Sequence, residues 1–130
     1  MENGMSVNYE KLNVISDSRG VVFEPLEGDK IFDKKNAHVV LSGPGVVRGN
    51  HFHKKGEETI AVMGPALVSV RDDAVIREIE IPRGEVYCFF FPPGQSHAIK
   101  NLSEDINILM AFNTIAHDPQ NPDTEEDLLL

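Results

Sequence analysis

Short segments rich in β-branched and aromatic residues recur along the chain, and turn residues separate each segment from the next. Segments of this composition are typical of strands, and Val75–Ile81 alternates apolar and charged side chains as a half-buried strand does. Glycine and proline mark the turns, as in Ser42-Gly-Pro-Gly45 and Pro92-Pro-Gly94. The predicted strands are Gly20–Glu24, Ala37–Leu41, Gly45–His53, Thr59–Met63, Ala66–Arg71, Val75–Ile81, Glu85–Phe91, Ser96–Asn101 and Asn107–Asn113.

Helical patterns are nearly missing from the sequence. No stretch long enough for a stable helix carries apolar residues at helical spacing. Only the tail, Thr124–Leu130, is expected to form a helical turn, with Thr124 as its cap. Many short strands with almost no helix predict an all-β protein, either a sandwich or a closed barrel.

The length of 130 residues fits one domain of common size. We expect this domain to span 1–130, with its core at about 14–116 and arms at 1–8 and 117–130. The apolar end, Leu128–Leu130, is expected to dock on the body or on a second subunit, because a solvated run of leucines is unfavourable. Barrels of this kind pair through edge strands, so a homodimer is expected.

Charge, hydropathy and cysteine content narrow the range of binding partners and cellular compartments. With 21 acidic and 12 basic residues, the formal net charge is -9, whereas nucleic-acid binding needs clustered basic charge, so that partner is not expected. No apolar stretch is long enough to span a bilayer and Met1–Asn13 lacks the apolar region of a signal peptide, so no membrane partner is expected. The single cysteine, Cys88, lies in an apolar run and predicts a buried thiol in a reducing cytoplasm.

Two histidines separated by one residue, His51 and His53, form the most distinctive chemical motif. Side chains at positions i and i+2 of a strand share a face, so both imidazoles can reach one metal ion. After the turn Lys54-Lys-Gly56 the next strand begins with Glu57 and Glu58, and a hairpin of this kind brings a carboxylate opposite the histidine pair. Glu58 shares its phase with the bulkier apolar residues of its strand, so we favour it as the inward ligand, while Glu57 stays open.

A third histidine, His97, follows the rigid turn Pro92-Pro-Gly94. The strand after this turn can return His97 to the cavity that holds the histidine pair. Only His38 and His117 lie outside this set. Three imidazoles and one carboxylate predict a divalent transition metal, with zinc favoured and nickel, iron or manganese open, because ligand number does not separate these metals.

The spacing of the first cluster resembles a known family. Gly45-x5-His51-x-His53-x4-Glu58, followed by Gly64, is similar to the first motif of the cupins. The step to Gly64 is one residue shorter than usual when it is measured from Glu58, and it is regular when measured from the preceding glutamate. The resemblance therefore supports the histidine pair and leaves the choice of glutamate open.

The second half of the cluster resembles the second cupin motif. Gly84 is followed by Pro92-x-Gly94-x2-His97, with a step from Gly84 to Pro92 that is two residues longer than usual and lengthens a hairpin. The two motifs cover about residues 45–101. The chain thus resembles the RmlC-like members of the cupin superfamily, which implies a double-stranded β-helix, the jelly-roll barrel.

Three further segments narrow the resemblance within the cupins. Asp17-Ser-Arg-Gly20 and Val47-Arg-Gly-Asn-His-Phe-His53 resemble elements of sugar-nucleotide epimerases and ketoisomerases. Asp118–Thr124 resembles the closing segment of the C-terminal cupin domain of capsular polysaccharide sugar-nucleotide reductases. By this resemblance Arg19 and Arg48 would bind the phosphates or the sugar of a substrate.

The resemblance implies an epimerase or isomerase of polysaccharide biosynthesis that acts on a sugar nucleotide or a related carbohydrate. The metal would polarise a keto oxygen while an α-proton leaves. The base is open among Lys54, Lys55, Glu57 and His38. The tyrosine acid of the metal-free 3,5-epimerases is not supported, because no tyrosine follows His97.

Two other functions stay open at this point. The first is a non-catalytic cupin that binds a small molecule, and the second is a metal-dependent cupin dioxygenase or decarboxylase. Arg19 and Arg48, with the segment Asp118–Thr124, favour a carbohydrate over the substrates of the second class. The metal site alone does not separate an enzyme from a binding protein.

Overall fold

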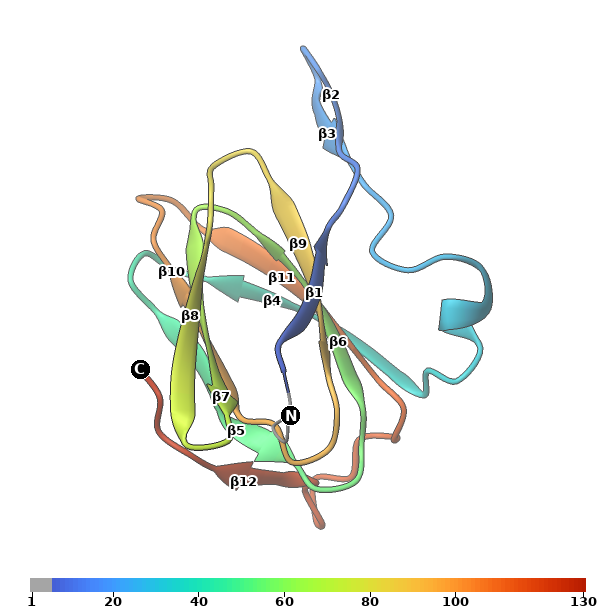
Figure 1. Ribbon diagram of the computed structural model, residues 1–130. Helices are drawn as coiled ribbons and strands as arrows, with labels where there is room; N and C mark the ends of the chain where they lie inside the picture. The colour runs from blue at the N-terminus through green and yellow to red at the C-terminus, as the bar shows by residue number, and fades with distance from the viewer. Residues whose placement is uncertain (1–5) are drawn as a thin grey trace.

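The protein is described by a computed structural model that covers residues 6–130 and is built almost entirely from antiparallel strands (Figure 1). The first sheet has the order β1-β9-β6-β11-β4, with bounds Asn8–Lys11, Val86–Phe91, Glu58–Met63, Asn107–Asn113 and Asn36–Ser42. The second has the order β12-β5-β10-β7-β8, with bounds Thr124–Glu126, Val47–His53, His97–Asn101, Ala66–Asp72 and Val75–Ile81.

The inward faces of these two sheets enclose one apolar core. Alternation along each strand places every second side chain inside, where burial contributes about 1.5–3 kcal/mol for a large apolar side chain. The core consists of Ile60, Val62, Ala66, Val68, Val70, Ile81, Phe89, Phe91, Ile99, Leu109 and Ala111. This core fixes the strands that carry the polar residues at one end of the barrel.

A two-stranded hairpin, β2 (Ile15–Asp17) with β3 (Gly20–Val22), projects away from the barrel (Figure 1). The single turn of 3-10 helix η1 (Gly28–Ile31) follows it, before the chain enters β4. Every residue of the hairpin strands is exposed. This projecting segment therefore packs little against its own barrel.

A bulge interrupts β5 beside the histidine pair. His97 of β10 pairs with His51, but the next residue, Ala98, pairs with Gly49, so Asn50 is an extra residue on β5. Gly49 and Asn50 both have positive φ, at 93° and 57°. Because one extra residue shifts the alternation of side chains, residues before the bulge change face relative to those after it.

The all-β prediction is confirmed, and each predicted strand corresponds to a strand of the structure. The helical turn expected at Thr124–Leu130 is wrong, because β12 occupies its first residues and pairs with β5. The predicted N-terminal arm, 1–8, falls mostly outside the described residues. Within residues 6–130, no helix has the length and apolar character needed to cross a bilayer.

Candidate metal centre

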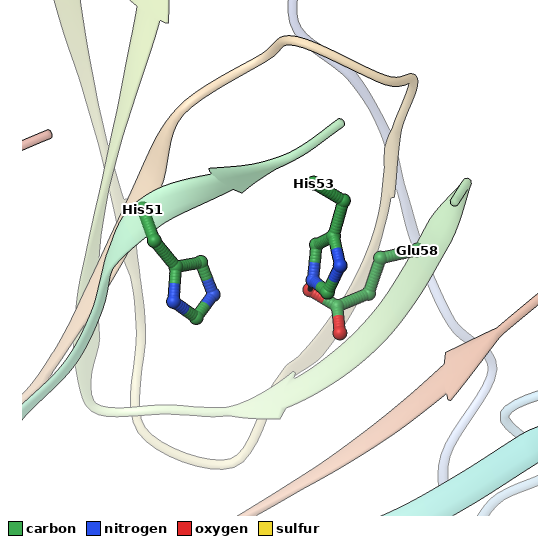
Figure 2. A group of neighbouring side chains, drawn as sticks. All are labelled: His51, His53 and Glu58. Carbon is green, nitrogen blue, oxygen red and sulfur yellow. Dashed lines mark ion pairs between the residues drawn. The ribbon is translucent and has the colours of Figure 1, made fainter. Parts of the chain in front are cut away.

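Three strands bring the predicted ligands together at one end of the barrel. His51 and His53 point the same way from β5, and Glu58 reaches them from the start of β6 (Figure 2). His97 is the first residue of β10 and pairs with His51 on the adjacent strand β5. All four side chains meet, although they come from three segments of the chain.

The distances among these side chains suit a shared cation. One carboxylate oxygen of Glu58, Oε1, lies 3.1 Å from Nε2 of His53 and 3.1 Å from Nε2 of His97. The ring centroid of His51 lies 5.4 Å from that of His53 and 5.2 Å from that of His97. Ligand atoms of His51, His53 and Glu58 lie within 4.8 Å of one another.

The centre is largely shielded from solvent. The side chains of His97 and Glu58 are 2% and 5% exposed, and that of His53 is 13% exposed. The ring of Phe91 stacks on His97 with centroids 4.1 Å apart and an interplanar angle of 9°. Burial of this kind strengthens the interaction of a carboxylate with a cation.

Hydrogen bonding at His97 determines which ring nitrogen faces the centre. Nδ1 of His97 lies 3.3 Å from the carbonyl oxygen of Gln95, which can only accept, so Nδ1 carries a hydrogen. In the neutral ring Nε2 then presents a lone pair to the centre. Two lone-pair atoms, Nε2 of His97 and Oε1 of Glu58, therefore face each other and need a proton or a metal ion between them.

The same need exists at His53. In the neutral ring that carries its hydrogen on Nδ1, the buried Nε2 faces the lone pairs of Oε1 of Glu58 at 3.1 Å, and no hydrogen bond satisfies it within residues 6–130. A buried polar atom without a partner costs about 1–3 kcal/mol, and a metal ion would remove that cost. The donor set and the lone pairs thus fit a divalent transition metal.

The pKa shifts favour the ligating forms of two groups. Burial, followed by the charge of His97, lowers the pKa of His51 to about 4, so this ring is neutral near pH 7. Burial alone would raise the pKa of Glu58, but hydrogen bonds with His53 and His97 outweigh it and hold the pKa well below its usual value. A neutral imidazole and an ionised carboxylate are the forms that bind metal.

His53 behaves differently. Burial acts to lower the pKa of His53, but the hydrogen bond and charge of Glu58, with a further effect of Asp123, raise it above its usual value. A proton on His53 therefore competes with a metal ion more strongly than a proton on His51 does.

Of the two neighbouring glutamates, the structure brings Glu58 to the histidines. Glu57 is exposed, and its backbone N–H donates to Oγ1 of Thr114 at 3.0 Å. Its side chain is on the opposite face of the strand from Glu58, as the alternation of β6 requires.

A hollow of about 1030 Å³ opens beside this centre, with His53 and Glu58 in its wall. The start of β4 forms one side of it, and the segment 115–124 covers another. The remaining lining residues are Asn36, His38, Lys54, Lys55, Asn113, Ile115, Ala116, His117, Asp118, Gln120, Asn121, Pro122, Asp123 and Thr124. This hollow has the size of a small-molecule binding site.

The two predicted arginines lie in different places. The bulge in β5 turns Arg48 to the face that carries the histidines, where its guanidinium donates to Oγ of Ser42 at 3.1 Å and to the carbonyl of Leu41 at 3.2 Å. Arg19 lies at the tip of the projecting hairpin, 89% exposed, and pairs with Asp17 at 2.6 Å. The structure therefore keeps Arg19 away from the centre of its own chain.

Three polar residues around the centre were not predicted from the sequence as site residues. Gln95 orients His97, Asn113 places Nδ2 3.4 Å from Nδ1 of His53, and Asp123 places Oδ2 3.6 Å from the same nitrogen. The resemblance at Asp118–Thr124 contained Asp123 without indicating its role. The predicted burial of Cys88 is confirmed: it is 1% exposed, and burial raises the pKa of its thiol to about 11.

Comparison with known proteins identifies relatives along most of the chain. The profile of the family described as "Polysaccharide biosynthesis C-terminal domain" matches residues 15–125. A UDP-2-acetamido-2,6-beta-L-arabino-hexul-4-ose reductase from Pseudomonas aeruginosa is 30% identical over 112 residues, which are 84% of this chain and 29% of that protein. A probable low-salt glycan biosynthesis epimerase from Haloferax volcanii is 27% identical over 140 residues, 96% of this chain and 88% of that protein.

Solved structures show the same barrel. The capsular polysaccharide assembling protein CapF from Staphylococcus aureus matches with a TM-score of 0.67 and 27% identity, over 91% of this chain and 33% of CapF. The rmlC epimerase from Mycobacterium tuberculosis matches with a TM-score of 0.69 and 19% identity, over 94% of this chain and 72% of that chain. These likenesses confirm the predicted RmlC-like cupin fold, and this chain spans only about a third of CapF and of the Pseudomonas reductase.

Proposed function

Because this chain belongs to the family of polysaccharide biosynthesis C-terminal domains, we propose that it is a metal-dependent epimerase or isomerase of a keto sugar nucleotide. The Haloferax relative, named as a probable epimerase, is matched over 88% of its length and supports this reaction class. The Pseudomonas relative is named for a UDP-linked hexul-4-ose, a keto sugar nucleotide, and supports this substrate class.

One observation carries the proposal. Three imidazoles and one buried carboxylate meet at a single point, and that point lies in the wall of a hollow of about 1030 Å³. We assign His51, His53, Glu58 and His97 as the ligands of the metal, with zinc favoured and nickel, iron or manganese as the other candidates. When bound there, the metal supplies Lewis-acid polarisation of a keto oxygen.

The residues of the chain supply the proton transfer. His38 is on the inward face of β4, because it pairs with the buried residue Ala111 across β11. Its Nδ1 lies 3.2 Å from Oδ1 of Asn36, so in the neutral ring that donates to this oxygen Nε2 carries the lone pair. His38 also lines the hollow, so we assign it as the base that removes the α-proton, after which the protonated ring or solvent returns a proton to carbon.

The other candidate groups fit this role less well. Glu57 is not among the residues that line the hollow. Lys54 and Lys55 line it from the turn after β5, whereas His38, which is also exposed, lines it from a strand of the barrel. Tyr9 and Tyr87 stack on each other at 5.6 Å, and neither lines the hollow in the described chain, 6–130. A tyrosine acid is therefore not part of the proposal.

The proposal also gives a role to Arg48. The bulge turns its guanidinium to the face that carries the histidines, where two hydrogen bonds hold it outside the lining of the hollow. An arginine fixed in this way can bind a phosphate oxygen of a substrate that extends beyond the hollow. Arg19 could serve the same substrate only in the site of a second copy, because it lies at the tip of the projecting hairpin.

The test begins with metal analysis of protein purified without an affinity tag. Wild type should retain zinc or another divalent ion after dialysis, and His51→Ala should not. Metal-loaded protein is then incubated in D₂O with a UDP-linked hexul-4-ose and followed by NMR. Deuterium at C3 or C5 is the expected result. Metal retention without deuterium uptake would favour a non-catalytic binding cupin, and equal retention by the variant would reject the centre.

His38 is tested in the same assay. His38→Gln should slow deuterium uptake by about 10²–10⁴-fold, the usual contribution of a general base. The affinity for zinc should stay at the wild-type value, since His38 is not a ligand. Lys55→Gln is the matched control in the same hollow, and a larger loss of rate in this variant would reassign the base to Lys55.

We further infer that the protein is a cytoplasmic homodimer. Ile15, Val22 and Phe32 of the projecting segment are 64%, 64% and 81% exposed. Val39 and Leu41 on the outer face of edge strand β4 are 61% and 56% exposed. A second copy would cover both surfaces at once through a two-fold axis, which is the commonest arrangement of a dimer.

A further inference from the structure

The last residues of the chain form a strap, residues 123–130, that lies across the edge of the barrel beside the metal centre. Its strand β12 pairs with β5, with Thr124 opposite His53 and Glu126 opposite His51 (Figure 1). The strap thus extends the second sheet next to two of the proposed ligands.

The far end of the strap is anchored by side chains. The carboxylate of Asp127 accepts two hydrogen bonds from Arg71, at 2.7 and 2.8 Å. The side chain of Asn50 accepts from the N–H groups of Leu129 and Leu130, at 2.8 and 3.0 Å, and donates to the carbonyl of Leu130 at 3.1 Å. These contacts hold the far end of the strap, and the pairing of β12 with β5 fixes the position of its near end.

Asp123, at the near end, binds the turn that joins the histidine strand to the glutamate. Its carbonyl accepts from the N–H of Lys54 at 2.8 Å. Its carboxylate accepts from the N–H of Lys55 at 3.0 Å and from the N–H of Gly56 at 2.8 Å. One residue therefore takes three successive backbone donors, which fixes the path of the chain between His53 and Glu58.

The packing around this turn leaves no room for a side chain at Gly56. A Cβ atom on Gly56 would collide with the side-chain amide of Asn113 and would lie 3.1 Å from Oδ2 of Asp123. The turn is thus closed against both side chains, and the carboxylate of Asp123 is only 18% exposed.

The same carboxylate faces the outer nitrogen of His53. Oδ2 of Asp123 lies 3.6 Å from Nδ1, while Nε2 faces Glu58. Asn113 also approaches Nδ1, but with its Nδ2 donor, because its Oδ1 accepts from the N–H of Ile115 at 2.9 Å. If Nε2 binds a metal, Nδ1 of the neutral ring carries a hydrogen, and Asp123 is then the acceptor placed to receive it.

We propose that Asp123 is a positioning residue that orients His53 toward the metal and fixes the turn that carries the ligand pair His53 and Glu58. The inference rests on the proposed metal centre, and it adds a residue outside the ligand set. Residues of this kind set ring orientation and tautomer, and their loss costs about 10–100-fold in metal affinity.

The experiment measures zinc affinity of the full chain by competition with a chromophoric chelator. Asp123→Asn removes the charge and should weaken zinc binding by about 10–100-fold. Glu125→Gln makes the same change of charge at an exposed position of the same strap and should leave the affinity unchanged. Equal affinities of the two variants would overturn the proposal. No zinc binding by wild type would reject the metal centre itself, which is a different outcome.

Asp123→Asn could also lose affinity through partial unfolding, so a second measurement uses wild type alone. Long-range ¹⁵N–¹H NMR of the zinc-loaded protein reports which nitrogen of His53 carries the hydrogen. The proposal predicts a hydrogen on Nδ1 and zinc on Nε2. Zinc on Nδ1 would overturn it, because Asp123 would then have no hydrogen to accept.

Discussion

A Cβ atom on Gly49 would lie 2.7 Å from the carbonyl oxygen of His97. Strands β5 and β10 can approach this closely only because position 49 has no side chain, and its φ of 93° is one that L-residues with a side chain rarely adopt. The bulge that follows places His51 opposite His97. The geometry of two proposed ligands thus depends on one glycine.

Gly49→Ala is therefore expected to lower the free energy of unfolding by about 2–5 kcal/mol, because left-handed strain costs about 1–2 kcal/mol and overpacking about 1–3 kcal/mol. Urea unfolding of the metal-free protein measures it. Gly43→Ala is the matched control, since a Cβ there would meet only Cγ2 of Val46 at 3.8 Å. If both variants had the same stability, the close approach at Gly49 would not be a constraint on the fold.

Much of the barrel and part of the centre follow from local sequence. Alternation in Val75–Ile81 predicts a strand, and the structure has one there, although only Ile81 is buried and only Ile79 is half-buried. The phase of Glu58 with its apolar neighbours predicts an inward side chain, which is 5% exposed. The bulge at Asn50 could not be predicted, because its positive φ is stabilised by contacts with residues 129 and 130. Strand β12 is not predictable for a similar reason: Thr124–Glu126 has no apolar alternation, and pairing with β5 makes it a strand.

The choice between the two neighbouring glutamates gives the sharpest test of the ligand set. Glu58→Gln should weaken zinc binding by more than about 100-fold, since changes outside the ligand shell already cost about 10–100-fold. Glu57→Gln changes the same charge on an exposed side chain and should bind zinc as wild type does. Competition with a chelator measures both affinities. If both variants lost zinc affinity to a similar extent, the assignment of Glu58 over Glu57 as the ligand would be rejected.

His51 should make the stability of the metal-free protein depend on pH. Burial lowers its pKa from 6.5 to about 4, so between these values the unfolded chain binds more protons than the folded one. Stability linked to His51 is therefore present above pH 6.5 and is lost as the pH falls toward 4. The lowered pKa of Glu58 acts in the same direction, but only below its unfolded value of 4.5.

Urea unfolding of wild type and of His51→Gln, both treated with a chelator, isolates this effect. As the pH falls from 6.5 toward 4, the unfolding free energy of wild type should decrease more than that of the variant. The raised pKa of His53 acts above pH 6.5, where its contribution is lost as the pH rises. A difference that stays constant across the acid range would show that His51 is not buried in its neutral form.

The proposed dimer can be tested at the two exposed apolar surfaces. Phe32→Ser in the projecting segment and Leu41→Glu on the outer face of β4 should each convert the dimer to a monomer, since each surface needs the other to be covered. Val75→Ser, at a 53% exposed position on β8, is the matched control and should leave the mass unchanged. Light scattering gives the mass of each protein. The partner copy would cover residues of the projecting segment, so loss of the dimer should also increase proteolysis near Arg19. A monomeric wild type would contradict the proposed dimer and with it the expected change in proteolysis.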